Sequence, residues 1–372
     1  MIPRRIICAA ILLLCGMFFG LMLINCANPA SSSTDTSPDL WRKSFTIDSN
    51  SVLITALCKT AANGVYVAGN IYLADGNTDL FVLKADKDGN QQWLMKYKWI
   101  GTDSTAAICA TADSGFSLTG IAKRFSIFHG NKNGDSLWIK EYGWGFGFGR
   151  GIIGTSDGGM ALTGQNGISY SSTGCLIRTD SSGTQIFLKD YESNTLGGRI
   201  VEMSDGSLTV FGDKDSNDLD PTVAPAVIAA RISSTGTIIW KKRISLSAHM
   251  NRVVGAAQGQ NEQLVIAIDT ITATENGMVM AVSGAGDSLW TVPVASGPFF
   301  SMSTTGDGNC FVFGKKPCLE ERRLTDGSIA KQKDLDASSS AHHGVFAGDG
   351  YVLAGEDPAI TGTINVIKLK RL

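Results

Sequence analysis

An all-β fold is predicted by three features of the 372-residue sequence. Glycine accounts for 43 residues, whereas charged residues make up only 18%, so turns are frequent and long charged helices are scarce. Beyond the first 25 residues, no segment has a sustained apolar pattern of helical period. Short apolar runs bounded by turn residues recur instead, for example at 65–69 and 80–85. Together these features indicate strands joined by tight turns.

The N-terminus has the layout of an export signal. Arg4 and Arg5 precede an uncharged run that ends at Asn25, and the run is also long enough for a signal-anchor helix, which is the alternative. The residues Leu-Ile-Asn-Cys ending at Cys26 resemble the lipobox of bacterial lipoproteins, although Asn25 stands where that family has Gly, Ala or Ser. The resemblance implies cleavage before Cys26 and lipidation of its thiol. Because Ala27 rather than aspartate follows, it also implies the outer membrane or the cell surface rather than the inner membrane.

Three segments follow from this layout. Residues 1–25 are the signal peptide, residues 26–38 are the lipidated cysteine with a tether, and residues 39–372 are a single domain. The tether is small, polar and proline-containing, which is typical of a flexible linker. Without residues 1–25 the chain carries 30 Lys and Arg against 34 Asp and Glu, a net charge of −4. This balance gives no reason to expect a nucleic-acid partner.

Two short motifs recur along the domain. The first is a turn ending in glycine and followed four residues later by an aromatic residue, as in Asp-Gly89-Asn-Gln-Gln-Trp93. Its glycines are 41 to 53 residues apart: Gly89, Gly134, Gly183, Gly236, Gly286 and Gly327. The second is a turn and an apolar run, whose copies end at Gly69, Gly120, Gly164, Gly212, Ile268, Gly314 and Gly355. Periods of roughly 40–50 residues signal repeated supersecondary units.

The repeat predicts a β-propeller. Each unit contains several strand-like runs, and four strands per unit make a propeller blade. Seven copies of the second motif predict seven blades of about 48 residues each. The last unit ends after a third strand, at 364–372, whereas residues 40–45 look like a fourth strand with its tryptophan. We therefore predict that the N-terminal strand completes the last blade and closes the ring without an exposed edge.

The two motifs resemble those of bacterial secreted β-propellers with quinoprotein-like or kelch-like repeats. The shared pattern is a DGG turn with an apolar run ending in glycine, and a D-x-x-G-x-x-x-W turn, over nearly all of residues 39–372. The resemblance implies the fold but no single function, because propellers host enzymes, scaffolds and ligand binders alike. The cofactor-binding and catalytic residues of pyrroloquinoline quinone dehydrogenases match no positions here, so no cofactor is expected.

The repeated aromatic residues are interpreted as packing residues, because they recur once per blade and bury much apolar area between sheets. Five cysteines follow the tether, an odd number that does not suggest a disulfide framework. A bridge between Cys310 and Cys318 across a hairpin is one option in an oxidising compartment. Cys58 and Cys109 fall at equivalent points of successive units and are interpreted as small buried apolar residues.

An acidic segment in the fourth unit is the candidate for a metal site. Asp213, Asp215 and Asn217 have the spacing of oxygen ligands that begins a calcium-binding loop. Asp218 stands where such a loop needs glycine, and Ala224 stands where it needs a bidentate glutamate. We favour a solvated loop and keep calcium as the alternative.

Aromatic and cationic residues concentrate in the segments that link the outer strand of one blade to the inner strand of the next. In a propeller these segments converge on one face around the central channel. Arginine, histidine and aromatic rings there would bind an acidic or sugar-like partner by charge-assisted hydrogen bonds and stacking. The alternative is that the glycine-rich segment 143–151 only plugs the channel. The candidate binding residues are Trp99, Trp144, Phe146, Phe148, Arg150, Arg199, His249, Arg252, His342 and His343.

No catalytic motif of the GxSxG or HExxH type accompanies the four histidines. His342 and His343 are not expected to bind metal together, because adjacent residues on a strand point to opposite faces. Our primary hypothesis is a non-catalytic, monomeric, membrane-anchored lipoprotein that binds an envelope protein or polysaccharide through the convergent loop face. One alternative is an exported enzyme, polysaccharide-active or quinone-dependent, with a site at the mouth of the channel. Another is a scaffold subunit in outer-membrane assembly, by resemblance to the lipoprotein propeller of that machinery.

Overall fold

In the computed structural model of the protein, residues from Asp39 to Leu372 form one compact unit built from strands. Within the residues that the structure describes, no helix is long and apolar enough to cross a membrane. The described residues are 39–98, 104–122, 124–143, 147–167, 173–214, 226–245, 251–259, 261–270, 276–294, 299–314, 318–335 and 341–372.

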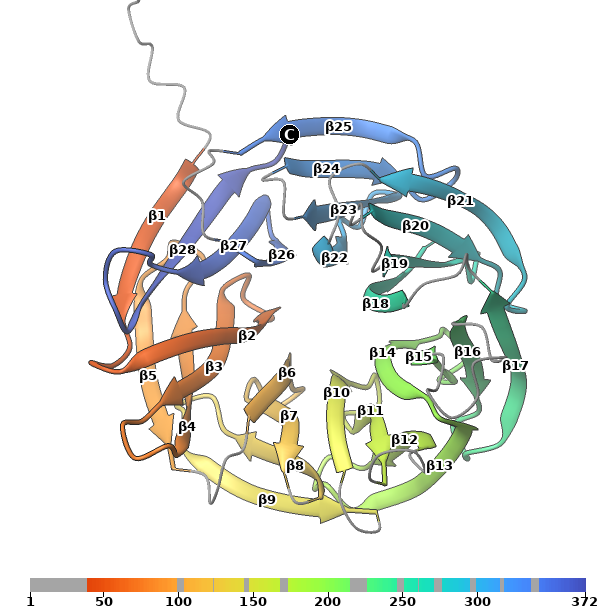
Figure 1. Cartoon of the computed structure of the whole chain (residues 1–372), viewed down its shortest axis with the longest axis horizontal. Helices are drawn as coiled ribbons and strands as arrows, with labels where there is room; N and C mark the ends of the chain where they lie inside the picture. Colours follow the sequence, from red (N-terminus) through yellow and green to blue (C-terminus); the bar gives the residue numbers. More distant parts are fainter. Residues whose placement is uncertain are drawn as a thin grey trace, which may run out of the picture. The chain divides into compact units, whose positions relative to one another are not determined.

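The strands form seven four-stranded antiparallel blades arranged in a ring, which confirms the predicted seven-bladed propeller (Figure 1). From the channel outward, the strands of blades 1 to 3 are β2 (Ser51–Lys59), β3 (Val65–Tyr72), β4 (Thr78–Ala85) and β5 (Gln91–Tyr97); β6 (Ser104–Ala110), β7 (Phe116–Ala122), β8 (Phe125–Gly130) and β9 (Ser136–Tyr142); β10 (Gly147–Gly154), β11 (Met160–Asn166), β12 (Thr173–Thr179) and β13 (Gln185–Ser193). Those of blades 4 to 7 are β14 (Leu196–Glu202), β15 (Leu208–Lys214), β16 (Ala226–Ile232) and β17 (Ile238–Ser245); β18 (Asn251–Gln258), β19 (Leu264–Thr270), β20 (Asn276–Val282) and β21 (Ser288–Val294); β22 (Phe299–Thr304), β23 (Asn309–Gly314), β24 (Cys318–Arg323) and β25 (Ile329–Asp334); β26 (His343–Ala347), β27 (Gly350–Glu356), β28 (Thr363–Lys370) and β1 (Asp39–Thr46).

The ring closes as the sequence predicts. Strand β1 pairs antiparallel with β28, from Thr46 opposite Thr363 to Asp39 opposite Leu369, so the first strand is the outer strand of the last blade. Elsewhere the blades are separate sheets, except that a short ladder between β7 and β10 joins blades 2 and 3.

The core lies between the blades. Buried apolar side chains form seven clusters in the described residues, and each cluster belongs to the interface of two neighbouring blades. The cluster between blades 7 and 1, for example, contains Phe45, Phe81 and Ile364. Large apolar area removed from water at every interface is the main force that holds such a ring together.

The aromatic residue of each outer strand packs against the turn glycine of the next blade. Trp240 of β17 lies against Gly286, in the turn between β20 and β21. A Cβ atom on Gly286 would lie 2.8 Å from the Trp240 ring, and the φ of +83° also favours glycine. Equivalent Cβ atoms would lie 2.5 to 3.2 Å from the ring in five further pairs: Trp41 with Gly89, Trp93 with Gly134, Trp138 with Gly183, Phe187 with Gly236, and Trp290 with Gly327. Each copy of the first motif thus receives the ring of the preceding blade on its glycine and sends its own ring to the following blade.

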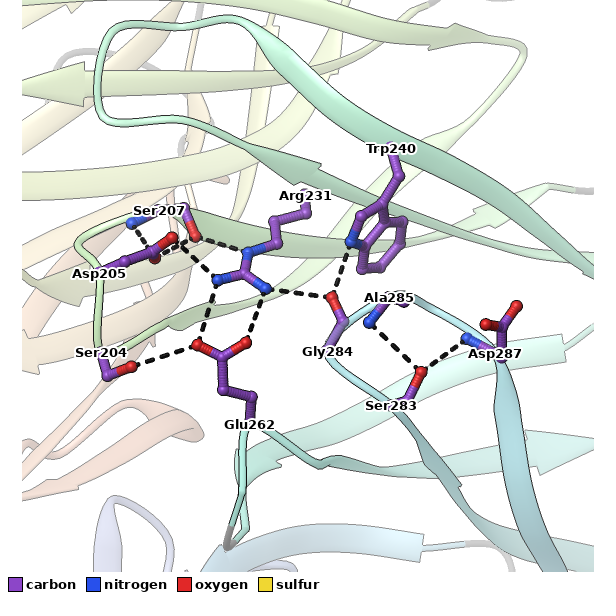
Figure 2. Close-up of polar contacts among 10 residues, drawn as sticks. All are labelled: Ser204, Asp205, Ser207, Arg231, Trp240, Glu262, Ser283, Gly284, Ala285 and Asp287. Carbon is purple, nitrogen blue, oxygen red and sulfur yellow. Dashed lines mark hydrogen bonds and ion pairs between the residues drawn. The ribbon is translucent and has the colours of Figure 1, made fainter.

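Polar contacts reinforce this packing between blades 4 and 5 (Figure 2). Trp240 Nε1 and Arg231 Nη1 both donate to the carbonyl of Gly284 in blade 5, at 2.8 and 3.1 Å. The Arg231 guanidinium also forms ion pairs with Asp205 of its own blade at 3.0 Å and with Glu262 of blade 5 at 3.1 Å. Arg231 is buried, and its donors are shared between the two blades, so it holds them in a fixed relative position.

Blade 6 lacks the aromatic residue, and the structure explains why. Lys331 occupies the position of Trp240, opposite Glu321, but its neighbour is blade 7, whose third and fourth strands come from the two ends of the chain and so have no connecting turn. Lys331 Nζ donates to the carbonyl of Leu372 instead. Arg371 binds Glu321 at 2.9 Å and also Asp307, both in blade 6. Polar contacts of the C-terminus therefore replace the missing ring.

The predicted disulfide is wrong. Cys310 and Cys318 are both free thiols. The register of the β23–β24 hairpin places Cys310 opposite Arg322, whereas Cys318 lies at the start of β24, at the other end of the ladder. Cys58 and Cys109 do occupy equivalent positions in β2 and β6, and burial raises the pKa of both thiols.

Replacing a turn glycine tests the contact between blades. Gly286→Ala introduces a methyl group against Trp240 at a position with positive φ, whereas Gly306→Ala has the same φ of +83° and nothing within 4 Å. Both variants bear the cost of a left-handed alanine, but only Gly286→Ala is overpacked, so it should be less stable than Gly306→Ala by about 1–3 kcal/mol. Urea unfolding followed by tryptophan fluorescence measures this difference. Equal midpoints for the two variants would mean that the ring does not press on the glycine.

Candidate functional site: the channel mouth

The inner strands share a β-bulge near the start of each strand. A bulge bends its strand and redirects the side chain at that point, and bulges are frequent at the rims of closed sheets and beside functional sites. In the described residues the bulge recurs in the inner strands of blades 1 to 6, between Ile54 and Ala56, Thr105 and Ala107, Gly149 and Gly151, Gly197 and Arg199, Val253 and Gly255, and Phe299 and Ser301. Arg150 is itself the extra residue in β10, and Arg199 directly follows the bulge in β14.

Two cavities inside the ring share Arg150, Arg199 and His343 in their linings. The first, of about 430 Å³, is lined by residues of all seven inner strands and is therefore the central channel. The second, of about 450 Å³, is lined by residues at or next to the bulges. We call the charged and histidine side chains of the second cavity the channel mouth: Arg150, Arg199, Asp213, Arg252, His342 and His343.

Arg199 is held by backbone carbonyl groups. Its Nε donates to Val254 O at 3.0 Å, and its Nη1 donates to Gly198 O at 3.0 Å and to Arg150 O at 3.3 Å. These acceptors come from three consecutive blades. None of the carboxylates in the described part of the chain forms an ion pair with Arg199, so its charge is balanced only at longer range.

Arg150 and Arg252 flank Arg199 and face buried carboxylates. Arg150 Nη1 is 3.8 Å from Asp213 Oδ2, and Arg252 Nη2 is 3.3 Å from Asp269 Oδ2. Both carboxyl groups are almost fully buried, whereas the Arg150 and Arg252 side chains are 40% and 56% exposed. The two arginines therefore keep part of their donor capacity available to a ligand.

The blade 7 side of the mouth carries the two histidines. His343 Nε2 lies 3.1 Å from Ile54 O, and His342 Nε2 lies 3.1 Å from Glu356 Oε2. The expectation that the two side chains point apart is wrong: their ring centroids are 5.0 Å apart, because His342 precedes β26 and does not follow its alternation. Burial, followed by the neighbouring His342, lowers the pKa of His343 to about 4, so His343 is neutral at pH 7.

The three arginines crowd positive charge at the mouth. Burial lowers the pKa of the Arg199 guanidinium, Asp213 opposes this change, and Arg252 and Arg150 lower the pKa further. An arginine in a protein nevertheless stays protonated. An anion bound among the three guanidinium groups would reduce their mutual repulsion.

A second recurring position was missed from the sequence. The residue directly after the second motif accepts a hydrogen bond from the backbone N–H of the next inner strand, as Asn70 does from Thr105 at 3.0 Å. Asp213 accepts from Val253 N at 2.8 Å, and Glu356 accepts from the backbone of blade 1 in the same way. Polar residues at this single position of the repeat, namely Asn70, Gln165, Asp213, Asp269 and Glu356, were the available signal.

The structure thus brings together Arg150, Arg199, Arg252, His342 and His343 of the predicted binding residues. Phe148 is half-buried in β10, opposite Gln165. The remaining predicted binding residues lie outside the described residues: Trp99, Trp144, Phe146 and His249.

The calcium prediction remains a prediction. Asp215 and Asn217 lie outside the described residues, and Asp213 contacts Val253 N and Arg150. Among the described residues, no three His, Cys, Asp or Glu side chains are grouped so as to hold a metal ion.

No family model and no curated protein sequence matches this chain. Solved propellers are similar in structure. The Dos1 propeller is 10% identical with a TM-score of 0.56, and the match covers 89% of this chain and 95% of that chain. The WD40 repeats of RRP9 are 11% identical with a TM-score of 0.61, covering 90% and 98%. At these identities the similarity shows the fold alone, a β-propeller.

His343 predicts a pH dependence of stability. Its pKa of about 4 in the folded protein is below the ordinary value of 6.5, so the unfolded chain binds a proton that the folded protein does not. This contribution to stability is complete above about pH 6.5 and is lost as the pH falls toward about 4, by at most about 1.4 kcal/mol per pH unit. Urea unfolding across this range should therefore show wild type losing stability relative to His343→Gln. A stability difference that does not change with pH would contradict this account.

Proposed function

We propose that the protein is an exported, monomeric, non-catalytic propeller that is lipid-anchored at Cys26 and binds an acidic envelope partner through the channel mouth. The partner is a protein or a polysaccharide. The observation that carries the proposal is the convergence of Arg150, Arg199 and Arg252, from three consecutive blades, on one cavity. Function concentrates on such irregular segments when a rigid scaffold positions them.

Charge and exposure support an acidic partner. Arg199 is fixed by carbonyl groups, and Arg150 and Arg252 remain partly exposed beside it. Guanidinium groups form strong, directional, charge-assisted bonds with carboxylates and phosphates. A rim that is already ordered loses little side-chain entropy when it binds.

The N-terminal segment supports a membrane location. A charged-then-apolar leader ends at Cys26, and a short tether precedes β1. We propose the outer membrane or the cell surface, with the propeller held close to the bilayer and free to turn its mouth toward a partner.

Removing the three arginines tests the binding face. The combined variant Arg150→Ala, Arg199→Ala and Arg252→Ala should capture its partners at least about tenfold less in crosslinking on intact cells, because charged anchors at an interface centre dominate affinity. A matched control removes three exposed cations away from the channel, Arg42, Lys87 and Arg323. If the mouth variant folds, as judged by thermal unfolding, and captures the same partners in the same yield as the control, the mouth is not the binding face.

Labelling with a palmitate analogue tests the anchor. Wild type should incorporate the label and Cys26→Ala should not, whereas Cys318→Ala should be labelled like wild type because that thiol is buried in the domain. Membrane-bound protein that is unlabelled in all three chains would indicate a signal-anchor helix instead of a lipid.

A further inference from the structure

We infer that the channel mouth receives a uronic acid, a sugar whose single carboxylate is held by Arg199, so that the partner is an acidic polysaccharide. This inference rests on the proposed function and names the ligand class of the same site. It follows from the orientation of Arg199, the balance of charge at the mouth, and the groups that share the cavity.

Arg199 presents a fixed edge. Its Nε and Nη1 are occupied by the carbonyls of Val254, Gly198 and Arg150, whereas Nη2 has no acceptor among the described residues. Arg199 lines both cavities, at the point where the mouth opens into the channel. A guanidinium with a set plane and a free Nη2 suits a planar carboxylate that approaches from the channel axis.

The local charge suits one negative charge. Arg150, Arg199 and Arg252 face the buried carboxylates of Asp213 and Asp269, which leaves one positive charge in excess. On the blade 7 side, Glu356 is paired with His342, and His343 is neutral. A monoanion neutralises the excess, whereas a phosphate dianion would place a second charge beside Asp213.

The rest of the cavity suits a hydroxylated ring rather than an acidic side chain. The channel cavity of about 430 Å³ is lined by Arg199 together with the hydroxyl groups of Thr55, Ser301 and Ser303 and the ring of His343. Hydroxyl groups both donate and accept, as sugar hydroxyls require. Pockets of about 300–1,000 Å³ take whole small-molecule groups, so this volume holds a sugar residue and would be poorly filled by a glutamate side chain.

Calorimetric titration of the mature lipoprotein in detergent with three probes tests the ligand class. The probes are tetragalacturonate, neutral galactotetraose and pentaglutamate. Tetragalacturonate should bind at least tenfold more tightly than either of the others, and added salt should weaken it, because the attraction is partly screened. Arg199→Met should reduce tetragalacturonate affinity at least tenfold, whereas the exposed control Arg323→Met should not change it.

A second variant should gain affinity, which misfolding cannot mimic. Asp213→Asn keeps an oxygen to accept from Val253 N but removes the negative charge beside Arg150, so it should bind tetragalacturonate several-fold more tightly. Weaker binding by Asp213→Asn, equal or tighter binding of pentaglutamate or galactotetraose, or no binding of tetragalacturonate would each overturn the inference. If the inference fails while the triple arginine variant still loses its cellular partners, the mouth binds another acid and the proposed function stands. If the triple variant also keeps its partners, both fail.

Discussion

The contact between an aromatic ring of one blade and the turn glycine of the next is the interaction on which the ring depends. Each blade alone is a small sheet with two apolar faces, and it is stable only when both faces are covered. The ring–glycine contact sets the distance and rotation between successive sheets, because a glycine admits the ring and any Cβ atom would displace it. With that spacing repeated, the apolar clusters between the blades close on themselves.

The same spacing builds the channel mouth at the other end of the strands. The inner strands are packed tightly enough that the bulge at the start of each one places an extra residue at the rim. The repeat keeps the backbone of this rim constant while its side chains vary freely. Blades 3, 4 and 5 carry arginine at or beside the bulge, and blade 7 carries histidine, so a symmetric frame presents an asymmetric distribution of charge.

The repeat period and the three-stranded last unit were sufficient to predict seven blades and closure by β1. The fate of Asp213 was not predictable from its neighbours, because a run of acidic residues suggests a metal loop, whereas its contact with Val253 arises from the next blade, 40 residues away. The Cys310–Cys318 bridge failed because only the register shows that the two residues lie at opposite ends of a hairpin. Lys331 looked like a worn copy of the motif, and only the arrangement of the chain ends shows why no aromatic residue is needed there.

Closure by β1 also orders events in time. The first strand of the domain to be synthesised pairs with the last, as in the hydrogen bond between Ser44 and Asn365, 321 positions apart. Pairing over such separations slows folding, because the loop must close before any contact forms. The ring can therefore be completed only after the C-terminus has emerged. A chain that crosses a membrane from its N-terminus would remain open, and so threadable, until its last residues had passed.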